Sequence, residues 1–282
     1  MKNSAYYKIK KAILNSFIHL FLISVAITCL YPLLWMVCAS FKTQDTIFSS
    51  GSLIPRKFHF ENYFNAWQQG GFGGNFLNSI FYTVSVVLGI VVIASLAGYA
   101  FSRFRFPGKN VMFLTFIAAM MIPIPGSFVA LYVLLNKLQL RDTSIGYILC
   151  MINVGLSSSI FLLKTFFDKM PKELEDAARI DGCSKIGIWW HVALPFARPM
   201  IAVVVVFNAL NVWNEYVLAL VIFDNKSLMP LQRALVLFQG EFLTNYPLLM
   251  AGLTITALPI IIVYLLMQKH IVRGVIQASV FE

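Results

Sequence analysis

The sequence predicts an all-α integral membrane protein with six transmembrane helices. Of its 282 residues, 59% are hydrophobic and only 12% are charged, whereas soluble domains carry about 25% charged residues. The mean hydropathy is +0.77, and the charged residues lie between long apolar stretches rather than along them. Together these observations exclude a soluble domain, a disordered chain, a disulfide-built secreted module and a nucleic-acid-binding surface, despite the net charge of +10.

Six windows are long enough to cross a membrane, since a spanning helix needs about 20 predominantly apolar residues. Five of them contain no Asp, Glu, Lys or Arg and lie between Lys11 and Lys42, Glu61 and Arg103, Lys109 and Lys137, Asp142 and Lys164, and Glu241 and Lys269. The sixth runs from Pro199 to Phe223 and is interrupted only by Glu215. The first window exceeds the ~7–15 apolar residues of a signal core. We therefore favour an uncleaved anchor over a signal peptide cleaved near Val37-Cys38-Ala39.

The distribution of cations predicts the orientation. Six spans place both termini on one side, and cytoplasmic segments carry the excess of Lys and Arg. The segments on the side of the termini hold 15 of these residues, and the other three loops hold 7. We therefore expect a cytoplasmic N-terminus (1–12), a six-helix domain (13–270) with a cytoplasmic loop at 168–198, and a cytoplasmic C-terminal tail (271–282).

Two prolines interrupt the third span. Pro123 and Pro125 each remove a backbone donor and clash with the preceding turn, so the helix must break or kink there. In a membrane such a break is tolerated only against protein or water. We favour a hinge or an element lining a translocation pathway at Pro123 over a purely structural kink.

The residue patterns of common active sites are absent from the sequence. The cysteines form no C-x-x-C pair, the histidines show no H-E-x-x-H spacing, and neither a G-x-S-x-G elbow nor a Walker sequence occurs. Glu215 is the one ionisable residue inside a predicted span, and a single carboxylate makes a poor active site. We expect no catalysis, no metal site and no cofactor bound by this chain.

The most polar segment lies between the fourth and fifth spans. The stretch from Lys164 to Arg198 holds 11 of the 34 charged residues. Pro171 suits the first position of a helix, and the acidic residues that follow complement its positive N-terminal end. Glu175 and Arg179 are spaced to pair at i, i+4, and Gly182 is expected to end the helix.

Both short helices predicted in this segment are amphipathic. One face of the first carries Leu174, Ala177, Ala178 and Asp181, and one face of the second carries Ile186, Trp189, Trp190 and Ala193. Two such helices bent at a glycine make a protruding elbow on the cytoplasmic side. A docking surface for a partner protein is slightly favoured over helices lying on the membrane surface, with both tryptophans in the headgroup region.

The same segment resembles a known family. Asp176-Ala177-Ala178, then Gly182, Val192 and Leu194-Pro195 match the spacing of the E-A-A-x3-G-x9-I-x-L-P motif. That motif marks the membrane subunits of binding-protein-dependent ABC importers, and the flanking Pro171-Lys-Glu-Leu is similar to the maltose-type carbohydrate branch. The likeness extends over nearly the whole chain. Asp176 replaces the motif's Glu and Glu175 precedes it, so which carboxylate docks stays open.

The resemblance implies a type I ABC importer permease fold in a bacterial inner membrane. The elbow is then the coupling helix that docks on a cytoplasmic ATPase dimer, which holds ATP and Mg. A homologous second permease subunit and an extracytoplasmic sugar-binding protein complete the implied assembly, which imports a sugar or oligosaccharide. The implied coupling residues are Glu175, Asp176, Ala177, Ala178, Asp181, Gly182, Leu194 and Pro195.

Two further sets of residues are candidates for contact with substrate or binding protein. Asn208, Asn211 and Glu215 lie at i, i+3 and i+7 and form a polar stripe suited to hydrogen-bonding sugar hydroxyls. The alternative, that they bond neighbouring helices, is about equally favoured. By resemblance, the loop carrying Gln239, Gly240 and Glu241 reaches the binding protein, and an ordinary solvated loop is the alternative.

Two other classes of function compete with the permease subunit. A stand-alone secondary transporter or channel is the main alternative, but it predicts several intramembrane ionisable residues and an internal inverted repeat. An intramembrane enzyme lacks a nucleophile–base pair. A non-catalytic permease subunit is therefore favoured.

Overall fold

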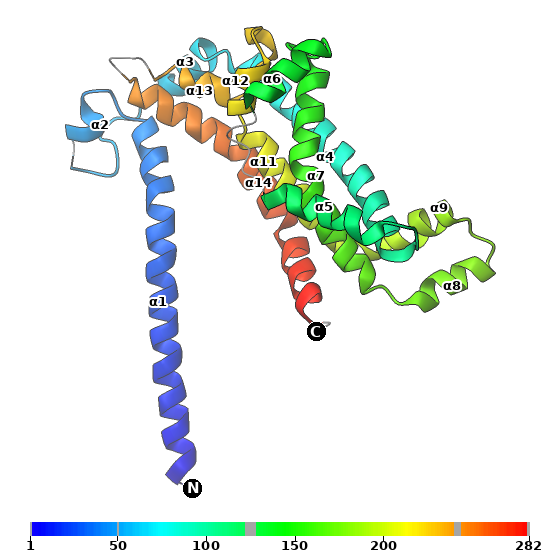
Figure 1. The fold of residues 1–282 in the computed structure, drawn as a ribbon. Coiled ribbons are helices and arrows are strands. Elements are labelled where there is room, and N and C mark those ends of the chain that lie inside the picture. The colour runs from blue at the N-terminus through cyan, green and yellow to red at the C-terminus, as the bar shows by residue number, and fades with distance from the viewer. Residues whose placement is uncertain (1, 50, 122–127, 240–243, 281–282) are drawn as a thin grey trace. The chain divides into compact units, whose positions relative to one another are not determined.

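The computed structural model describes residues 2–49, 51–121, 128–239 and 244–280, with side chains at 11, 13–49, 51–121, 128–239 and 244–268. Over these residues the chain is helical, with one isolated bridge between Gln239 and Thr244 and no strand (Figure 1). The helices are α1 (Lys2–Ser40), α2 (Thr46–Ser49), α3 (Glu61–Gln69), α4 (Phe72–Arg103), α5 (Lys109–Met121), α6 (Phe128–Lys137), α7 (Ser144–Asp168), α8 (Lys172–Ile180), α9 (Lys185–Ile188), a π-helical turn (Trp189–Ala193), α10 (Leu194–Phe196), α11 (Arg198–Asn214), α12 (Val217–Ile222), a 3-10 turn (Lys226–Leu228), α13 (Gln232–Val236) and α14 (Tyr246–Val280).

The predicted helical membrane architecture is confirmed, while the count of six spans stays a prediction. In the described residues, four helical segments are long and apolar enough to cross a membrane: Ile13–Ser40, Phe72–Arg103, Ser144–Asp168 and Tyr246–Gln268. A bent pair, Lys185–Phe196 with Arg198–Asn214, raises the number to five if it is one span. The predicted third span contains two shorter apolar helices, α5 and α6, and Pro123 lies outside the described residues.

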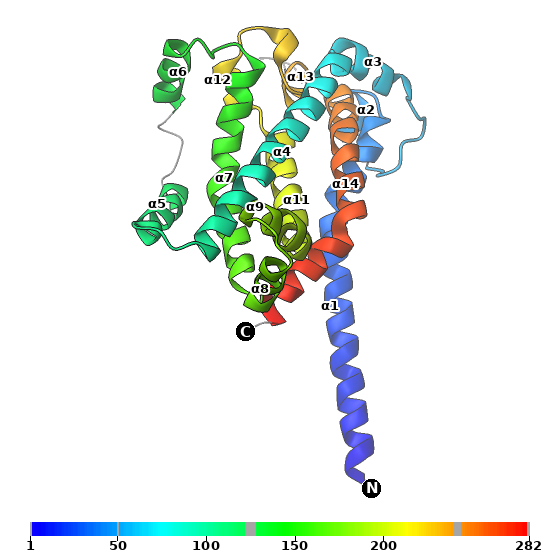
Figure 2. The same cartoon turned by 90° about the vertical axis from the view of Figure 1, so that its right-hand side faces the viewer.

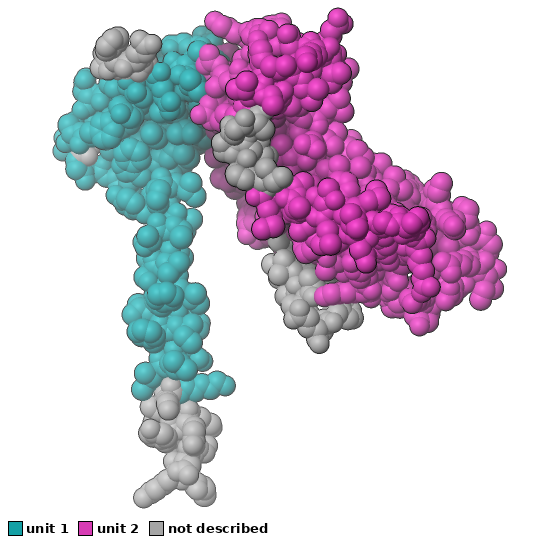
Figure 3. Space-filling view, viewed as in Figure 1, with its two compact units in different colours: residues 1–70, 235–255 teal, residues 71–234, 256–282 magenta. Residues whose placement is uncertain are grey.

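The chain forms two compact units, which Figure 3 distinguishes by colour. Residues 1–70 and 235–255 form unit 1, and residues 71–234 and 256–282 form unit 2. In unit 1 the described side chains of α1 from Ile13 to Leu34 are all exposed. Beyond α1, Phe41 packs against Phe58, Phe60 and Tyr63, with ring centroids 5.1–5.5 Å apart. This aromatic group gives the segment after α1 a small core of its own.

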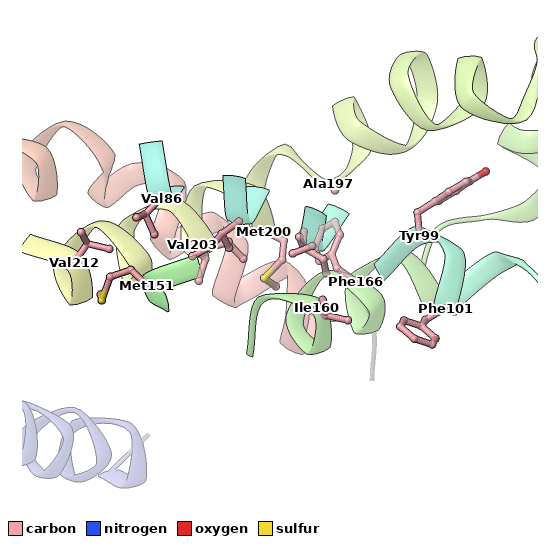
Figure 4. Close-up of a cluster of buried hydrophobic side chains, with 14 of the residues drawn as sticks. Val86, Tyr99, Phe101, Met151, Ile160, Phe166, Ala197, Met200, Val203 and Val212 are labelled. Atoms are coloured by element: carbon pink, nitrogen blue, oxygen red, sulfur yellow. The ribbon is translucent and has the colours of Figure 1, made fainter. Parts of the chain in front are cut away.

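Unit 2 is built on the packing of α4 against α7, which lie side by side in both ribbon views (Figure 2). Glycine permits this approach: a Cβ at Gly98 would lie 3.0 Å from the Lys164 backbone nitrogen and 3.1 Å from the Leu163 Cβ. Small residues at helix interfaces are how membrane helices come close together. The buried cluster of unit 2 extends from α4 and α7 to α11 through Val86, Met151, Ile160, Met200 and Val203 (Figure 4).

Candidate functional site

The polar segment between α7 and α11 contains short helices on either side of a glycine. Pro171 precedes α8, and after Ile180 the chain turns through Gly182, whose φ of +82° is the left-handed conformation that glycine adopts without strain. The Ser184 side chain then accepts a hydrogen bond from the Gly187 amide at 3.1 Å and caps α9. The axis from Lys185 to Phe196 meets α11 at 78°. We call residues 171–196 the elbow; α8 and α9 lie beyond the ends of α4 and α7 (Figure 1).

One face of α8 is anchored to the end of α4. Glu175 and Arg103 form an ion pair with Oε1 and Nε 2.8 Å apart, and their side chains are only 6% and 9% exposed. Arg103 also donates a hydrogen bond to the Met170 carbonyl just before α8. The predicted pair of Glu175 with Arg179 is present at 3.5 Å, but Arg179 is mostly exposed. Glu175 therefore holds α8 on the body of unit 2.

The opposite face of α8 points away from unit 2. Leu174, Asp176, Ala177 and Asp181 are exposed, whereas Ala178 is buried beside Glu175. Of the four residues predicted to share one face, Leu174, Ala177 and Asp181 are exposed and Ala178 is buried, so the boundary between the buried and exposed sides of α8 runs through the predicted face. The exposed face keeps a small residue, Ala177, between two carboxylates.

The second part of the elbow differs from the sequence prediction. Trp189 is 8% exposed and Ala193 is buried, as expected of an inner face, but Ile186 and Trp190 are 73% and 59% exposed. The π-helical turn at Trp189–Ala193 adds a residue to the turn and changes the direction of the side chains that follow Trp189, whereas Ile186 precedes this turn. Leu194 and Pro195 are half-buried, and Leu194 packs against the core of unit 2.

Glu215 lies at a break between two helices. α11 ends at Asn214, the Glu215 backbone is extended, and α12 begins at Val217. The Glu215 carboxylate accepts hydrogen bonds from the Leu218 amide at 2.6 Å, the Ala219 amide at 3.3 Å and the Tyr147 hydroxyl at 3.2 Å. It thus satisfies backbone donors at the start of α12 that have no partner within the helix.

The prediction of one helical stripe through Asn208, Asn211 and Glu215 is therefore wrong. A carboxylate in a membrane segment is costly unless it has partners, and here the break in the helix supplies them. Asn208 is buried and donates to the Ser159 hydroxyl at 3.0 Å and to the Val204 carbonyl at 2.8 Å. Asn211 is exposed and has no hydrogen bond to a described residue.

The remaining predicted residues are only partly described. Gln239 is exposed and pairs with Thr244 in the isolated bridge, whereas Gly240 and Glu241 lie outside the described residues. The Gln44 side chain bonds the residues that follow this segment: it donates a hydrogen bond to the Thr244 carbonyl at 2.8 Å and accepts one from the Tyr246 amide at 3.0 Å. Among the described residues no three His, Cys, Asp or Glu side chains gather as a metal site would require.

Arg103 is the functional residue that the sequence reasoning missed. In the sequence, Arg103 stands out only as the charged residue that ends the second apolar window. The available signal was its predicted position on the same side of the membrane as the elbow, which has acidic residues to pair with it. Nothing in the spacing identifies Glu175 as that partner, because the two residues are 72 positions apart and meet only through the packing of α4 and α7.

The amino-acid sequence of the chain is similar to that of a known family of proteins. Residues 89–277 match the family model described as the binding-protein-dependent transport system inner membrane component. The chain is 36% identical over 264 residues to the probable ABC transporter permease protein YurM of Bacillus subtilis, covering 94% of this chain and 86% of that protein. It is 30% identical to the diacetylchitobiose uptake system permease protein NgcG of Streptomyces coelicolor, covering 93% and 87%.

A solved structure shares the fold. It is described as a bacterial ABC transporter involved in the import of the acidic polysaccharide alginate, and the matched chain superposes with a TM-score of 0.80 at 24% sequence identity. The match covers 92% of this chain and 96% of that chain.

Proposed function

The chain belongs to the family of inner membrane components of binding-protein-dependent transport systems, and from that premise we propose that it is the subunit through which an ATP-driven importer passes a sugar or oligosaccharide. Relatives named for diacetylchitobiose uptake and for other carbohydrates support this substrate class. Family membership argues against a stand-alone secondary transporter or channel. The chain itself is non-catalytic, and a separate ATPase dimer holds ATP and Mg.

The observation that carries the coupling role is the two-sided character of α8. Its inner face is fixed to α4 through Glu175 and Arg103, and its outer face exposes Asp176, Ala177 and Asp181. When a partner protein displaces a helix that is anchored on one face and exposed on the other, the helices to which it is anchored move with it. We therefore assign Asp176 to the contact with the ATPase and Glu175 to the anchor.

The other partners follow from the same function. A homologous second permease subunit completes the membrane part, and an extracytoplasmic sugar-binding protein delivers substrate to the loop of Gln239, Gly240 and Glu241. Both termini of the chain are cytoplasmic in the bacterial inner membrane. Asn211, exposed on α11, contacts sugar hydroxyls in the pathway, whereas Asn208 and Glu215 hold the helices that shape it.

The experiment compares two glycines that share a backbone conformation. Gly182 and Gly108 have φ values of +82° and +77°, and a Cβ built at either meets nothing within 4 Å. Valine at either position strains the backbone, because a β-branched residue is an outlier at positive φ. We expect Gly182→Val to abolish sugar uptake and sugar-stimulated ATP hydrolysis by the complex, and Gly108→Val, outside the elbow, to retain both.

Membrane insertion and expression of both variants are measured by immunoblotting of membrane fractions, so that lost uptake is not confused with lost protein. Normal uptake by Gly182→Val at wild-type abundance refutes the coupling role of the elbow. Uptake of no carbohydrate by the wild-type complex, with the ATPase active, refutes the substrate class instead.

A further inference from the structure

An exposed group of aromatic rings follows the end of α1 in unit 1. Phe58, Phe60 and Phe64 are between 51% and 67% exposed. Phe60 and Phe64 are four positions apart and so lie on one side of α3, and the Phe58 ring stacks on Phe60 with centroids 6.2 Å apart. We call these three residues the aromatic face. A contiguous exposed apolar surface of this kind marks an interaction site.

Another side of α3 is polar. Glu61, Asn65 and Gln69 recur every four residues, and all three line a cavity of about 320 Å³ that is also lined by Gln44 and Asn245. The helix thus carries apolar rings on one side and hydrogen-bonding side chains on another. That division is typical of a helix that lies at the boundary between lipid and water.

Hydrogen bonds hold the start of α3 to the end of α1. The Asn62 side-chain amide donates to the Ser40 and Lys42 carbonyls at 2.8 and 2.9 Å. The hydroxyls of Ser40 and Tyr63 are hydrogen-bonded to each other at 2.7 Å. The depth of α3 in a membrane and the depth at which α1 ends are therefore linked.

The exposed length of α1 matches the thickness of the hydrocarbon layer. Its described side chains are exposed from Ile13 to Leu34, a stretch that rises about 33 Å, and the hydrocarbon core of a bilayer is about 30 Å thick. From Trp35 to Ser40 most side chains are half-buried or buried, and Trp35 packs against Phe48 of α2 with ring centroids 6.3 Å apart. The segment that carries α3 therefore begins where α1 leaves the hydrocarbon layer.

We propose that the aromatic face lies between the acyl chains and the headgroups of the membrane lipids, and that it fixes the depth of α1. Lipid is the occupant, because the face follows directly from the point where a helix of matching exposed length leaves the hydrocarbon layer. Phenylalanine is typical of the apolar side of interfacial helices. Through Asn62, an interfacial α3 holds Ser40 at the membrane boundary. The proposal rests on the membrane architecture and not on the solute that is transported.

Site-directed spin labelling of the whole complex in lipid nanodiscs tests the position of the aromatic face. In a chain whose four cysteines are changed to alanine, Phe64→Cys carries a nitroxide on the aromatic face. The matched control, Gln69→Cys, carries it on the polar side of the same helix, and both native side chains are exposed. Oxygen concentrates among the acyl chains, whereas a water-soluble nickel chelate stays outside them. We expect the ratio of oxygen collisions to nickel collisions to be several-fold higher at position 64 than at position 69.

Two outcomes at position 64 overturn the proposal. A label that collides mainly with the nickel chelate faces water, and a label that neither reagent reaches is covered by a partner protein. Phe60→Cys gives a second label on the aromatic face with the same expected result. Size-exclusion chromatography of each labelled variant beside the wild type checks that the complex is intact.

The anchoring role is measured at the end of α1. A nitroxide at Leu33→Cys, in the last exposed part of α1, reports the depth of that helix. Phe60→Gln with Phe64→Gln is expected to raise its collision rate with the nickel chelate several-fold, because α3 then moves toward water and draws the end of α1 with it. The control pair, Asn65→Ser with Gln69→Ser, is expected to leave that rate unchanged. An equal rate before and after the phenylalanine changes overturns the anchoring role.

Discussion

Arg103 and Glu175 place opposite charges where both side chains are largely closed off from solvent. A buried pair with good geometry is a poor source of net stability, but removing one partner leaves the other charge uncompensated. At the surface of α8, Arg179 and Asp176 form an ion pair at 3.1 Å in which both side chains are well exposed. Solvent and salt screen the attraction between these two charges. The same short helix therefore carries one carboxylate whose loss disturbs the fold and another whose loss does not.

This contrast gives the first prediction. Glu175→Gln is expected to lower the free energy of unfolding of the complex by about 3–5 kcal/mol, because the Arg103 charge is left buried and unpaired. Asp176→Asn is expected to cost less than about 1 kcal/mol, yet to reduce sugar-stimulated ATP hydrolysis. Thermal denaturation and ATPase assays on the same preparations measure both effects.

A double variant serves as the control for the buried pair. Arg103→Met combined with Glu175→Met removes both charges, so most of the lost stability returns. Equal destabilisation by Glu175→Gln and Asp176→Asn would show that the two carboxylates are not divided between anchor and contact.

Among the helices, the observed boundaries differ from the predicted ones where buried polar groups need hydrogen-bond partners. The long apolar windows correctly predicted α1, α4, α7 and α14, because hydropathy over some 20 residues is a strong signal. The break after Asn214 was not predicted, since Glu215 looks like a residue within one span until its bonds to the amides of Leu218 and Ala219 are known. The glycine stop at Gly182 was predictable because it depends only on local backbone conformation.

The α11–α12 break yields the second prediction. Glu215→Ala is expected to lower the unfolding free energy by about 1–2 kcal/mol, the range for loss of a helix cap, and Tyr147→Phe by less, because the backbone acceptor role of Glu215 survives. The apparent affinity for sugar is expected to stay unchanged in both. Asn211→Ala, in contrast, is expected to weaken it without a change in thermal stability. Equilibrium unfolding and substrate titration of ATPase activity distinguish these results, and a raised sugar requirement in Glu215→Ala alone would assign the pathway role to Glu215.

At the scale of the whole molecule, the +10 charge is an orientation signal in which 15 of the 22 cations lie on the predicted cytoplasmic side. The elbow lies on that side by the same count. One of the cations on that side, Arg103, also pairs with Glu175 and so anchors α8. On the other side, Lys42, Arg56 and Lys57 lie around one cavity. The distribution of cations predicts the side of the membrane, but the pairing of these charges depends on contacts between residues far apart in the chain.

The orientation leads to a third prediction. In a chain whose other cysteines, Cys29, Cys38 and Cys150, are changed to alanine, the half-buried Cys183 of the elbow is the remaining thiol. A membrane-impermeant maleimide is expected to label it in inside-out vesicles and not in intact cells. Labelling in intact cells would place the elbow on the outer face and reverse the topology.

Cross-linking at α8 tests the central claim most directly, that the exposed face of the elbow contacts the ATPase. In the chain lacking all four native cysteines, Ala177→Cys carries a photoactivatable maleimide on the exposed face, and Ala178→Cys carries it on the buried face one residue away. Irradiation of the complex is expected to join the chain to the ATPase subunit from position 177 and to give little such product from position 178. A complex that retains its ATPase but gives no product from position 177 would contradict the account.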